Sequence, residues 1–266
     1  MTFSPNALLY TALALYAAGT LVALASLFIR GTQLQRVGLG VMVLGFISHT
    51  FWIGSICVRT GHPPLTNLPE AASFVAWTVF AVELVLFIRY RVQAASFFVY
   101  PLVLILVTVS AVVREPFQKL DPSLRSGLFT AHLLLSTVGV AALFIGLAFT
   151  LLTYVQDRAL KNKSRGRMWE LIPSLNVCKL VSYRALAIGF SIYTLGLLAG
   201  ILWSYRTIAA PIDLRAKQIG AVVAWVLFAT LLQQILGGAY RGRRTMLISA
   251  GAFIATLVAI LGIHHG

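Results

Sequence analysis

The residues of this chain best suited to chemistry are its five histidines, His49, His62, His132, His264 and His265. An imidazole ring changes charge near neutral pH and binds transition metals. Two such rings can bind a haem iron, one from each face of the haem. That arrangement needs both rings at one depth, on elements that pack together. The elements that carry the histidines therefore decide what the rings can do.

The composition is that of a membrane protein, because 59% of the 266 residues are hydrophobic, 11% are charged and the mean hydropathy is +0.89. A water-soluble domain carries charge on about a quarter of its residues, whereas lipid-facing helices need none. An apolar run of about twenty residues can cross the hydrocarbon as a helix, which bonds its own backbone amides. The segments that qualify are 7–29, 37–56, 71–88, 95–113, 128–154, 186–205, 218–236 and 247–263. The sequence predicts an all-α polytopic bundle of eight transmembrane helices, forming one domain over residues 1–266.

The distribution of positive charge predicts the orientation of these helices. The formal net charge is +14, but no basic stretch carries the interleaved aromatics of a nucleic-acid-binding surface. Fourteen of the 21 Lys and Arg residues lie in the links 30–36, 89–93, 155–185 and 237–244, and the positive-inside rule places these links in the cytoplasm. Both termini are then predicted on the outer side of a bacterial inner membrane. The longest link is expected to be a solvated connection followed by a helix at the membrane surface around 168–172. The alternative is a docking surface for a cytoplasmic partner.

This orientation brings three of the histidines to the outer face. His132 lies about one turn inside the outer end of the segment 128–154, and His264 and His265 lie at the outer end of the last segment. The positions fit an axial haem site. From the residues alone, they fit better the polar groups found at the wet ends of membrane helices.

Two further polar residues lie within predicted spans and need partners there. His49 is expected to face the bundle, either as a haem ligand or in a hydrogen bond between helices, because an unpaired polar group in hydrocarbon costs several kcal/mol. Glu83 lies nearer the cytoplasm, with Arg89 within reach of it by snorkelling. A carboxylate at this depth is also what a small proton-coupled transporter would use.

The segment GHPPLTNLPE, residues 61–70, is a proline-rich outer loop in which Asn67 can cap the next helix. With His49 before it and Trp77 after it, this segment resembles the cytochrome c assembly proteins of the Ccs/Res type. These typically have a helix histidine, then GHxPLSNLYES, then a tryptophan. The likeness continues at HLLLS, which starts at His132 and is similar to the family's HVxxMxLSY, and at the C-terminal LGIHHG, which is similar to LGxGLHSYG. It covers most of the chain.

The resemblance implies haem handling. Members bind haem at the outer face, present it to apocytochrome c and hold its iron between two external histidines, which here would be His132 and either His264 or His265. The haem would be b-type and non-covalent, and the chain has no CxxCH motif that would make it a c-type cytochrome. The chain would not be an enzyme by itself, and at most one subunit of a synthetase that needs a second membrane subunit.

The chain also departs from the family pattern. The tryptophan-rich WGxxWxWDPKE that cradles haem is replaced by WSYRTIAAPIDLRAKQ at residues 203–218, in which Trp203 and Asp213 remain as candidate haem contacts. Gln233 and Gln234 stand where the family has a second in-membrane histidine. These departures resemble the HemX branch, which is associated with regulating the level of glutamyl-tRNA reductase. A HemX-like regulator with a cytoplasmic haem-synthesis enzyme as its partner is therefore the main alternative, and the proton-coupled transporter is the third.

Overall fold

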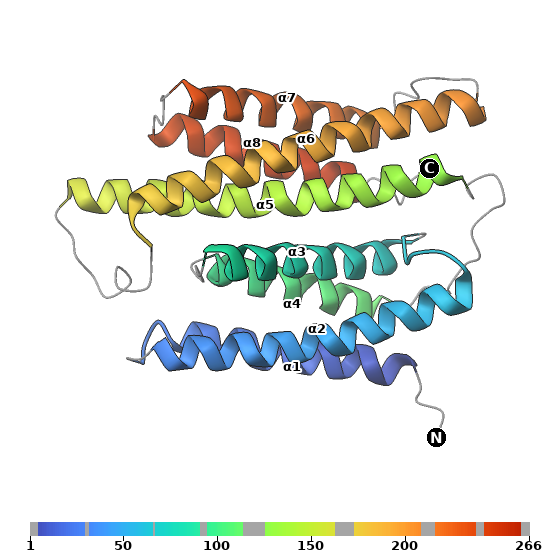
Figure 1. The fold of residues 1–266 in the computed structure, drawn as a ribbon, viewed down its shortest axis with the longest axis horizontal. Helices are drawn as coiled ribbons and strands as arrows, with labels where there is room; N and C mark the ends of the chain where they lie inside the picture. The colour runs from blue at the N-terminus through green and yellow to red at the C-terminus, as the bar shows by residue number, and fades with distance from the viewer. Residues whose placement is uncertain are drawn as a thin grey trace. The chain divides into compact units, whose positions relative to one another are not determined.

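The computed structural model describes residues 5–29, 32–65, 67–90, 95–113, 126–162, 173–208, 216–237 and 242–261. The regular secondary structure of these residues is entirely helical, which confirms the predicted all-α class. Within the described ranges the helices, drawn in Figure 1, are α1 (Pro5–Ala25), α2 (Thr32–Thr60), α3 (Leu68–Tyr90), α4 (Ser96–Val112), α5 (Gly127–Lys161), α6 (Leu175–Ile208), α7 (Ala216–Leu236) and α8 (Gly242–Leu261).

Helix length and apolar surface identify a polytopic membrane protein. Six helices, α1, α2, α3, α5, α6 and α7, are long and apolar enough to cross a membrane. The shorter α4 has 17 residues, at the lower end of what spans a bilayer. Many large apolar side chains lie on the outside, including Phe28 at 77% and Val58 at 87% exposure. In water such surfaces would be unfavourable, so lipid is their natural environment.

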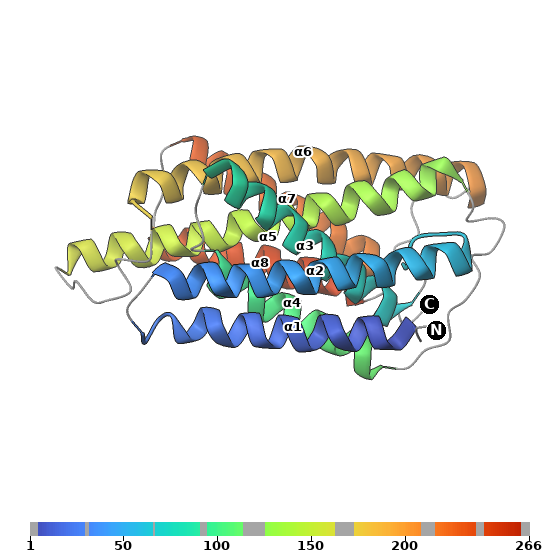
Figure 2. The ribbon, with the colours of Figure 1, turned by 60° about the horizontal axis from the view of Figure 1, so that its bottom comes forward.

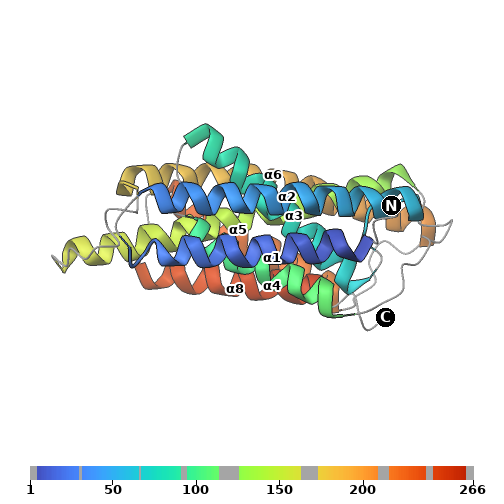
Figure 3. The same cartoon turned by 90° about the horizontal axis from the view of Figure 1, so that it is seen from below.

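The helices form two compact units, residues 1–121 and 122–266, and the single domain inferred from the sequence stays a prediction. In unit 1, α1 and α2 pack side by side as an antiparallel hairpin, seen from two directions in Figures 2 and 3. Three buried rings come from α1, α3 and α4, namely Tyr16, Phe80 and Tyr100. The ring centroid of Phe80 lies 6.0 Å from that of Tyr16 and 6.0 Å from that of Tyr100. Aromatic contacts of this kind add about 0.5–1.5 kcal/mol each. They tie α3 to α1 on one side and to α4 on the other.

In unit 2, α5 and α6 run antiparallel in very close contact (Figure 1). A Cβ atom added to Gly139 would lie 2.6 Å from the backbone nitrogen of Tyr193, and one added to Gly189 would lie 2.8 Å from that of Leu143. Larger residues at these two positions would therefore force the helices apart. Small residues commonly bring membrane helices this close. A hairpin of α7 and α8 completes the unit, with Phe228 buried in the core.

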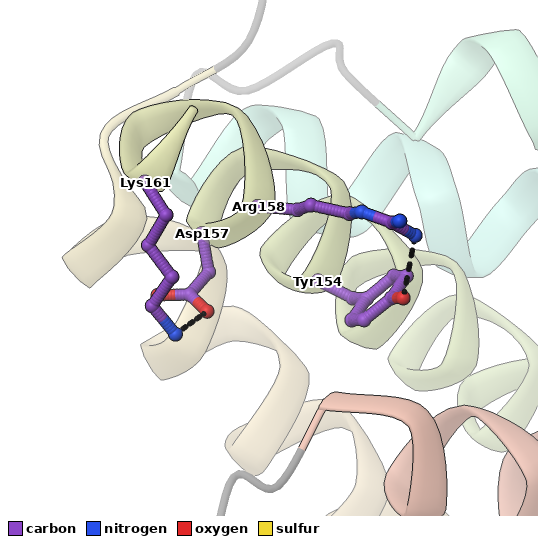
Figure 4. A network of polar contacts seen from close by, with 4 residues as sticks. All are labelled: Tyr154, Asp157, Arg158 and Lys161. Carbon is purple, nitrogen blue, oxygen red and sulfur yellow. Dashed lines mark hydrogen bonds and ion pairs between the residues drawn. The ribbon is translucent and has the colours of Figure 1, made fainter. Parts of the chain in front are cut away.

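The helices α5 and α6 are longer than the sequence predicts. They contain 35 and 34 residues, or about 50 Å each, whereas the hydrocarbon core is about 30 Å thick. The last turns of α5 are polar (Figure 4), with an ion pair of 2.7 Å between Asp157 and Lys161 and a hydrogen bond of 3.2 Å from Arg158 to the Tyr154 hydroxyl. The predicted apolar segments end at 154 and begin again at 186, whereas α5 continues to Lys161 and α6 already begins at Leu175. These two bounds are wrong for the helices, because a helix can continue through polar residues beyond its apolar stretch. The predicted surface helix at 168–172 lies outside the described residues.

Candidate functional site

His132 lies in the first turns of α5, where this helix packs against the C-terminal half of α6. The helix begins with a cap in which the Phe129 backbone N–H donates to the Ser126 hydroxyl at 3.1 Å. The half-buried His132 ring points to α6, and its Nδ1 lies 2.8 Å from the carbonyl oxygen of Gly196. Gly200, one turn further along α6, also lies against the ring, since a Cβ atom added there would be 2.6 Å from Nδ1.

The contact with Gly196 determines which nitrogen of the neutral His132 ring carries the proton. A carbonyl oxygen can only accept a hydrogen bond, so Nδ1 carries the proton and donates it. In the neutral ring Nε2 then keeps its lone pair. The Ser136 hydroxyl is a distant 3.4 Å from Nδ1, and Nε2 forms no hydrogen bond within the part of the chain that the structure describes. A metal-binding histidine usually has this arrangement, in which one ring nitrogen donates a hydrogen bond and the other has a lone pair available for the metal.

Trp203 supplies an aromatic wall near this histidine. Its ring packs against Phe129 with the centroids 4.9 Å apart. Phe129 lies one turn before His132 on α5, and Trp203 lies one turn after Gly200 on α6, so the pair sits beside His132 toward the helix ends. The Trp203 Nε1 is buried and has no hydrogen-bond acceptor among the described residues. A buried donor without a partner costs about 1–3 kcal/mol. A bound ligand that supplied a hydrogen-bond acceptor to this N–H would therefore be favoured.

The other members of the predicted outer site, Asp213, His264 and His265, lie outside the described residues. The last described helix, α8, ends at Leu261, shortly before the two terminal histidines. Helices α5 and α8 run in opposite directions within unit 2 (Figure 1). The last turn of α8 and the first turn of α5 therefore lie toward the same end of the unit.

His49 is fully buried in unit 1, and both of its ring nitrogens are hydrogen-bonded. Nδ1 lies 3.2 Å from the hydroxyl of Tyr16 on α1, and Nε2 lies 2.6 Å from the hydroxyl of Ser73 on α3. The ring also contacts Trp52. This geometry is that of a hydrogen bond between helices, one of the two predicted alternatives. Ligation of a haem iron would require one of the two bonds to break.

The loop before α3 is ordered by local hydrogen bonds. Gly61 has a φ of +77°, in the left-handed region that favours glycine, and it ends α2. The buried His62 ring has its Nδ1 2.8 Å from the carbonyl oxygen of Pro63. The Asn67 side chain accepts from the Glu70 backbone N–H at 2.9 Å and donates to the Glu70 carboxylate at 3.3 Å. The predicted cap at Asn67 is therefore confirmed.

Glu83 has a different partner from the one that the sequence suggests. It is buried in α3 and accepts a hydrogen bond from the hydroxyl of Ser96 on α4, while its Oε2 has no partner among the described residues. Arg89 instead lies over the ring of Tyr90, 5.5 Å from the centroid. Both residues are in the described part of the chain and no ion pair joins them, so the predicted snorkelling contact is wrong.

The sequence is similar to that of known proteins. Over residues 65–265 the sequence matches the family described as cytochrome C assembly protein. The chain belongs to this family. As a cytochrome c assembly protein it is similar to "Cytochrome c biogenesis protein CcsA" of Gloeobacter violaceus, with 24% identity over 94% of this chain and 90% of the relative. Proteins of the same name from Prochlorococcus marinus, with 27% identity over 77% of this chain and 74% of the relative, and from Guillardia theta, with 24% identity over 86% and 82%, are similar too.

Sequence reasoning found two of the residues grouped at this end of the cytochrome c assembly protein, His132 and Trp203, and missed three. The missed residues are Phe129, Gly196 and Gly200, which surround the histidine and the tryptophan. A signal for the glycines was present, because GLLAG at 196–200 is the GxxxG pattern that lets a second membrane helix approach closely. That pattern does not indicate which helix packs against α6 or which of its residues lie opposite the two glycines.

Proposed function

We propose that this protein handles haem during cytochrome c assembly, and that it holds the haem iron between His132 Nε2 and either His264 or His265. Each iron–nitrogen bond would be about 2 Å, so the two ring nitrogens would lie about 4 Å apart. Haem here is cargo to be passed to an apocytochrome, and it would be held without a covalent bond. The family match supports this assembly role over the regulator and the transporter.

The single observation that carries the proposal is the hydrogen bond from His132 Nδ1 to the Gly196 carbonyl. Metal-binding histidines almost always donate their second nitrogen to a carbonyl or carboxylate, which fixes the ring and raises its basicity. The same bond leaves Nε2 as the atom that binds. Among the histidines with described side chains, His132 alone combines this bond with a half-buried ring in an apolar helix.

The surroundings of His132 also suit a porphyrin, which is an apolar disc with two propionate groups. Phe129 and Trp203 offer aromatic surface, and the unpartnered Trp203 Nε1 can donate to a carboxylate oxygen. The exposed Arg206 follows Trp203 by less than a turn and is a candidate for the propionates. Asp213, in the segment between α6 and α7, would contribute as well.

The haem would be bound on the outer side of a bacterial inner membrane. This side follows from the positive-inside rule and the cations in the links 30–36, 89–93, 155–185 and 237–244. A reporter enzyme that folds only outside the cytoplasm, fused after Gly266, should be active. Activity of a cytoplasmic reporter at the same position would contradict this orientation. Passing haem to an apocytochrome from that side would involve a second assembly subunit in the membrane.

The proposed function is tested by the spectrum and haem content of the intact protein purified in detergent. A Soret band, a pyridine haemochrome of the b-type and complete extraction of the haem by acidified acetone are expected. A protein that stays colourless and takes up no added haemin would contradict the proposal. Co-purification of that colourless protein with a cytoplasmic haem-synthesis enzyme would point to the regulator instead.

A further inference from the structure

Helix α6 has two glycines at the level of His132, and we propose that they hold the imidazole in the orientation that metal binding requires. These residues, Gly196 and Gly200, are called the glycine notch below. They are positioning residues, because they act on the iron-binding nitrogen only through the rest of the ring. The inference rests on the proposed haem-binding role of His132 and adds the residues that make the ring competent for it.

Gly200 leaves room for the ring. A Cβ atom at this position would lie 2.6 Å from Nδ1 and 2.8 Å from Cε1 of His132, far inside the roughly 3.5–4.0 Å at which carbon atoms pack best. The overlap is with a side chain that can rotate about its χ angles, not with the backbone of α5. A methyl group at 200 would therefore turn the imidazole and leave the two helices close together.

Gly200 also uncovers the carbonyl to which the ring donates. Within an α-helix the Gly196 oxygen accepts from the N–H of residue 200, and its second lone pair remains available. Because Cβ atoms tilt toward the helix N-terminus, a side chain at 200 would stand over that oxygen. With hydrogen in its place, Nδ1 of His132 reaches the oxygen from the neighbouring helix at 2.8 Å.

Gly196 acts in a second way, by setting the separation of the helices. A Cβ atom on it would lie 2.7 Å from the backbone nitrogen of Ser136 and 2.6 Å from its hydroxyl oxygen. A contact with backbone is relieved only by moving α5, and Ser136 lies one turn from His132. A larger residue at 196 would therefore carry the whole imidazole away from its acceptor, whereas one at 200 would only rotate it.

Gly200→Ala is the informative variant, because it disturbs the ring alone. In the haem-free protein, ¹⁵N NMR of the histidine rings should show His132 protonated at Nδ1 in the wild type and a mixture of tautomers in the variant. With haem bound, the wild type should be low-spin, and the variant should gain a high-spin fraction that excess imidazole removes. Its haem affinity should fall about 10–100-fold, the usual effect of disturbing the hydrogen-bond partner of a metal-binding histidine.

Gly146→Ala is the matched control. The added Cβ atom would lie 2.6 Å from Leu186 Cγ and 3.0 Å from the Leu186 backbone nitrogen in the same pair of helices, so this variant should be less stable. Because it lies about four turns of α5 from His132, it should keep the wild-type tautomer and spectrum. Wild-type His132 protonated at Nε2 would overturn the inference, whether or not Gly200→Ala folds. A Gly200→Ala protein with the wild-type tautomer and spectrum would overturn it too. If the tautomer shifts as expected but the wild type takes up no haem, the glycine notch stands and the haem proposal fails.

Discussion

His49 and His132 are both histidines within apolar helices, yet their surroundings differ in the property that decides what an imidazole can do. In unit 1, His49 is fully buried and both ring nitrogens are bonded, to Tyr16 and to Ser73. In unit 2, His132 is half-buried, and one nitrogen is bonded to the Gly196 carbonyl while the other is left with a lone pair. The first ring links three helices, and the second is oriented by one neighbouring helix, with no hydrogen bond at Nε2 among the described residues.

A position within an apolar helix therefore does not by itself identify a metal-binding histidine. A satisfied imidazole stabilises the bundle, since each polar group in hydrocarbon needs a partner. An imidazole with one committed nitrogen is free to bind a metal with the other. The two histidines should therefore respond in opposite ways to substitution, one in folding and the other in haem binding.

The largest effect is expected for His132→Ala. Haem occupancy should fall by more than about tenfold, since loss of the ligand should cost at least as much as loss of its hydrogen-bond partner. The free energy of unfolding of the haem-free protein should change little, because the ring is only half-buried. The measurement is the ratio of Soret absorbance to protein, with denaturant unfolding in detergent alongside. Equal haem occupancy in variant and wild type would break the contrast with His49.

His49→Ala should give the reverse pattern. It leaves the hydroxyls of Tyr16 and Ser73 without their shared partner and opens a cavity in unit 1, at an expected cost of about 2–4 kcal/mol in the free energy of unfolding. The protein that folds should keep the wild-type ratio of haem to protein. Loss of haem from a folded His49→Ala protein would mean that this ring, too, is a ligand.

Much of the fold could be predicted from the sequence, because apolar length alone determines which segments cross a membrane. The C-terminal end of α5 and the start of α6 could not, since both helices run past the apolar stretch, in α5 through turns held by the ion pair of Asp157 and Lys161. For the site, the charge pattern and the motif likeness pointed to His132, but the partners of both histidines depend on which helices pack together. Which helices pack together depends on the three-dimensional structure. For His132, the sequence indicated a close helix contact only through the two glycines of GLLAG.

Asn67→Ala should have a smaller effect, confined to stability. Its side chain accepts from the Glu70 N–H at the start of α3, and loss of such a cap typically costs about 1 kcal/mol. Thermal unfolding in detergent measures this change, and Asn67→Asp, which keeps the accepting oxygen, is the control. A changed haem spectrum in folded Asn67→Ala would link this loop to the haem site.

A comparably small effect is expected for His62→Ala. The ring is bonded to the adjacent Pro63 carbonyl and lies in a loop of unit 1, so its loss should cost about 0.5–1.5 kcal/mol. The Soret band should keep its position and intensity. Loss of that band in a folded His62→Ala protein would mean that this loop, and not α5, provides the ligand.

Chemical rescue tests most directly the claim that His132 Nε2 binds the haem iron. His132→Gly removes the side chain and leaves a space into which free imidazole can enter, next to the Gly196 carbonyl that orients the native ring. Without imidazole the variant should bind little haem, in a high-spin form. With millimolar imidazole it should regain the low-spin spectrum and the haem content of the wild type, whereas the same addition should leave His49→Gly unchanged. A His132→Gly protein that binds haem with the wild-type low-spin spectrum in the absence of imidazole would contradict the account.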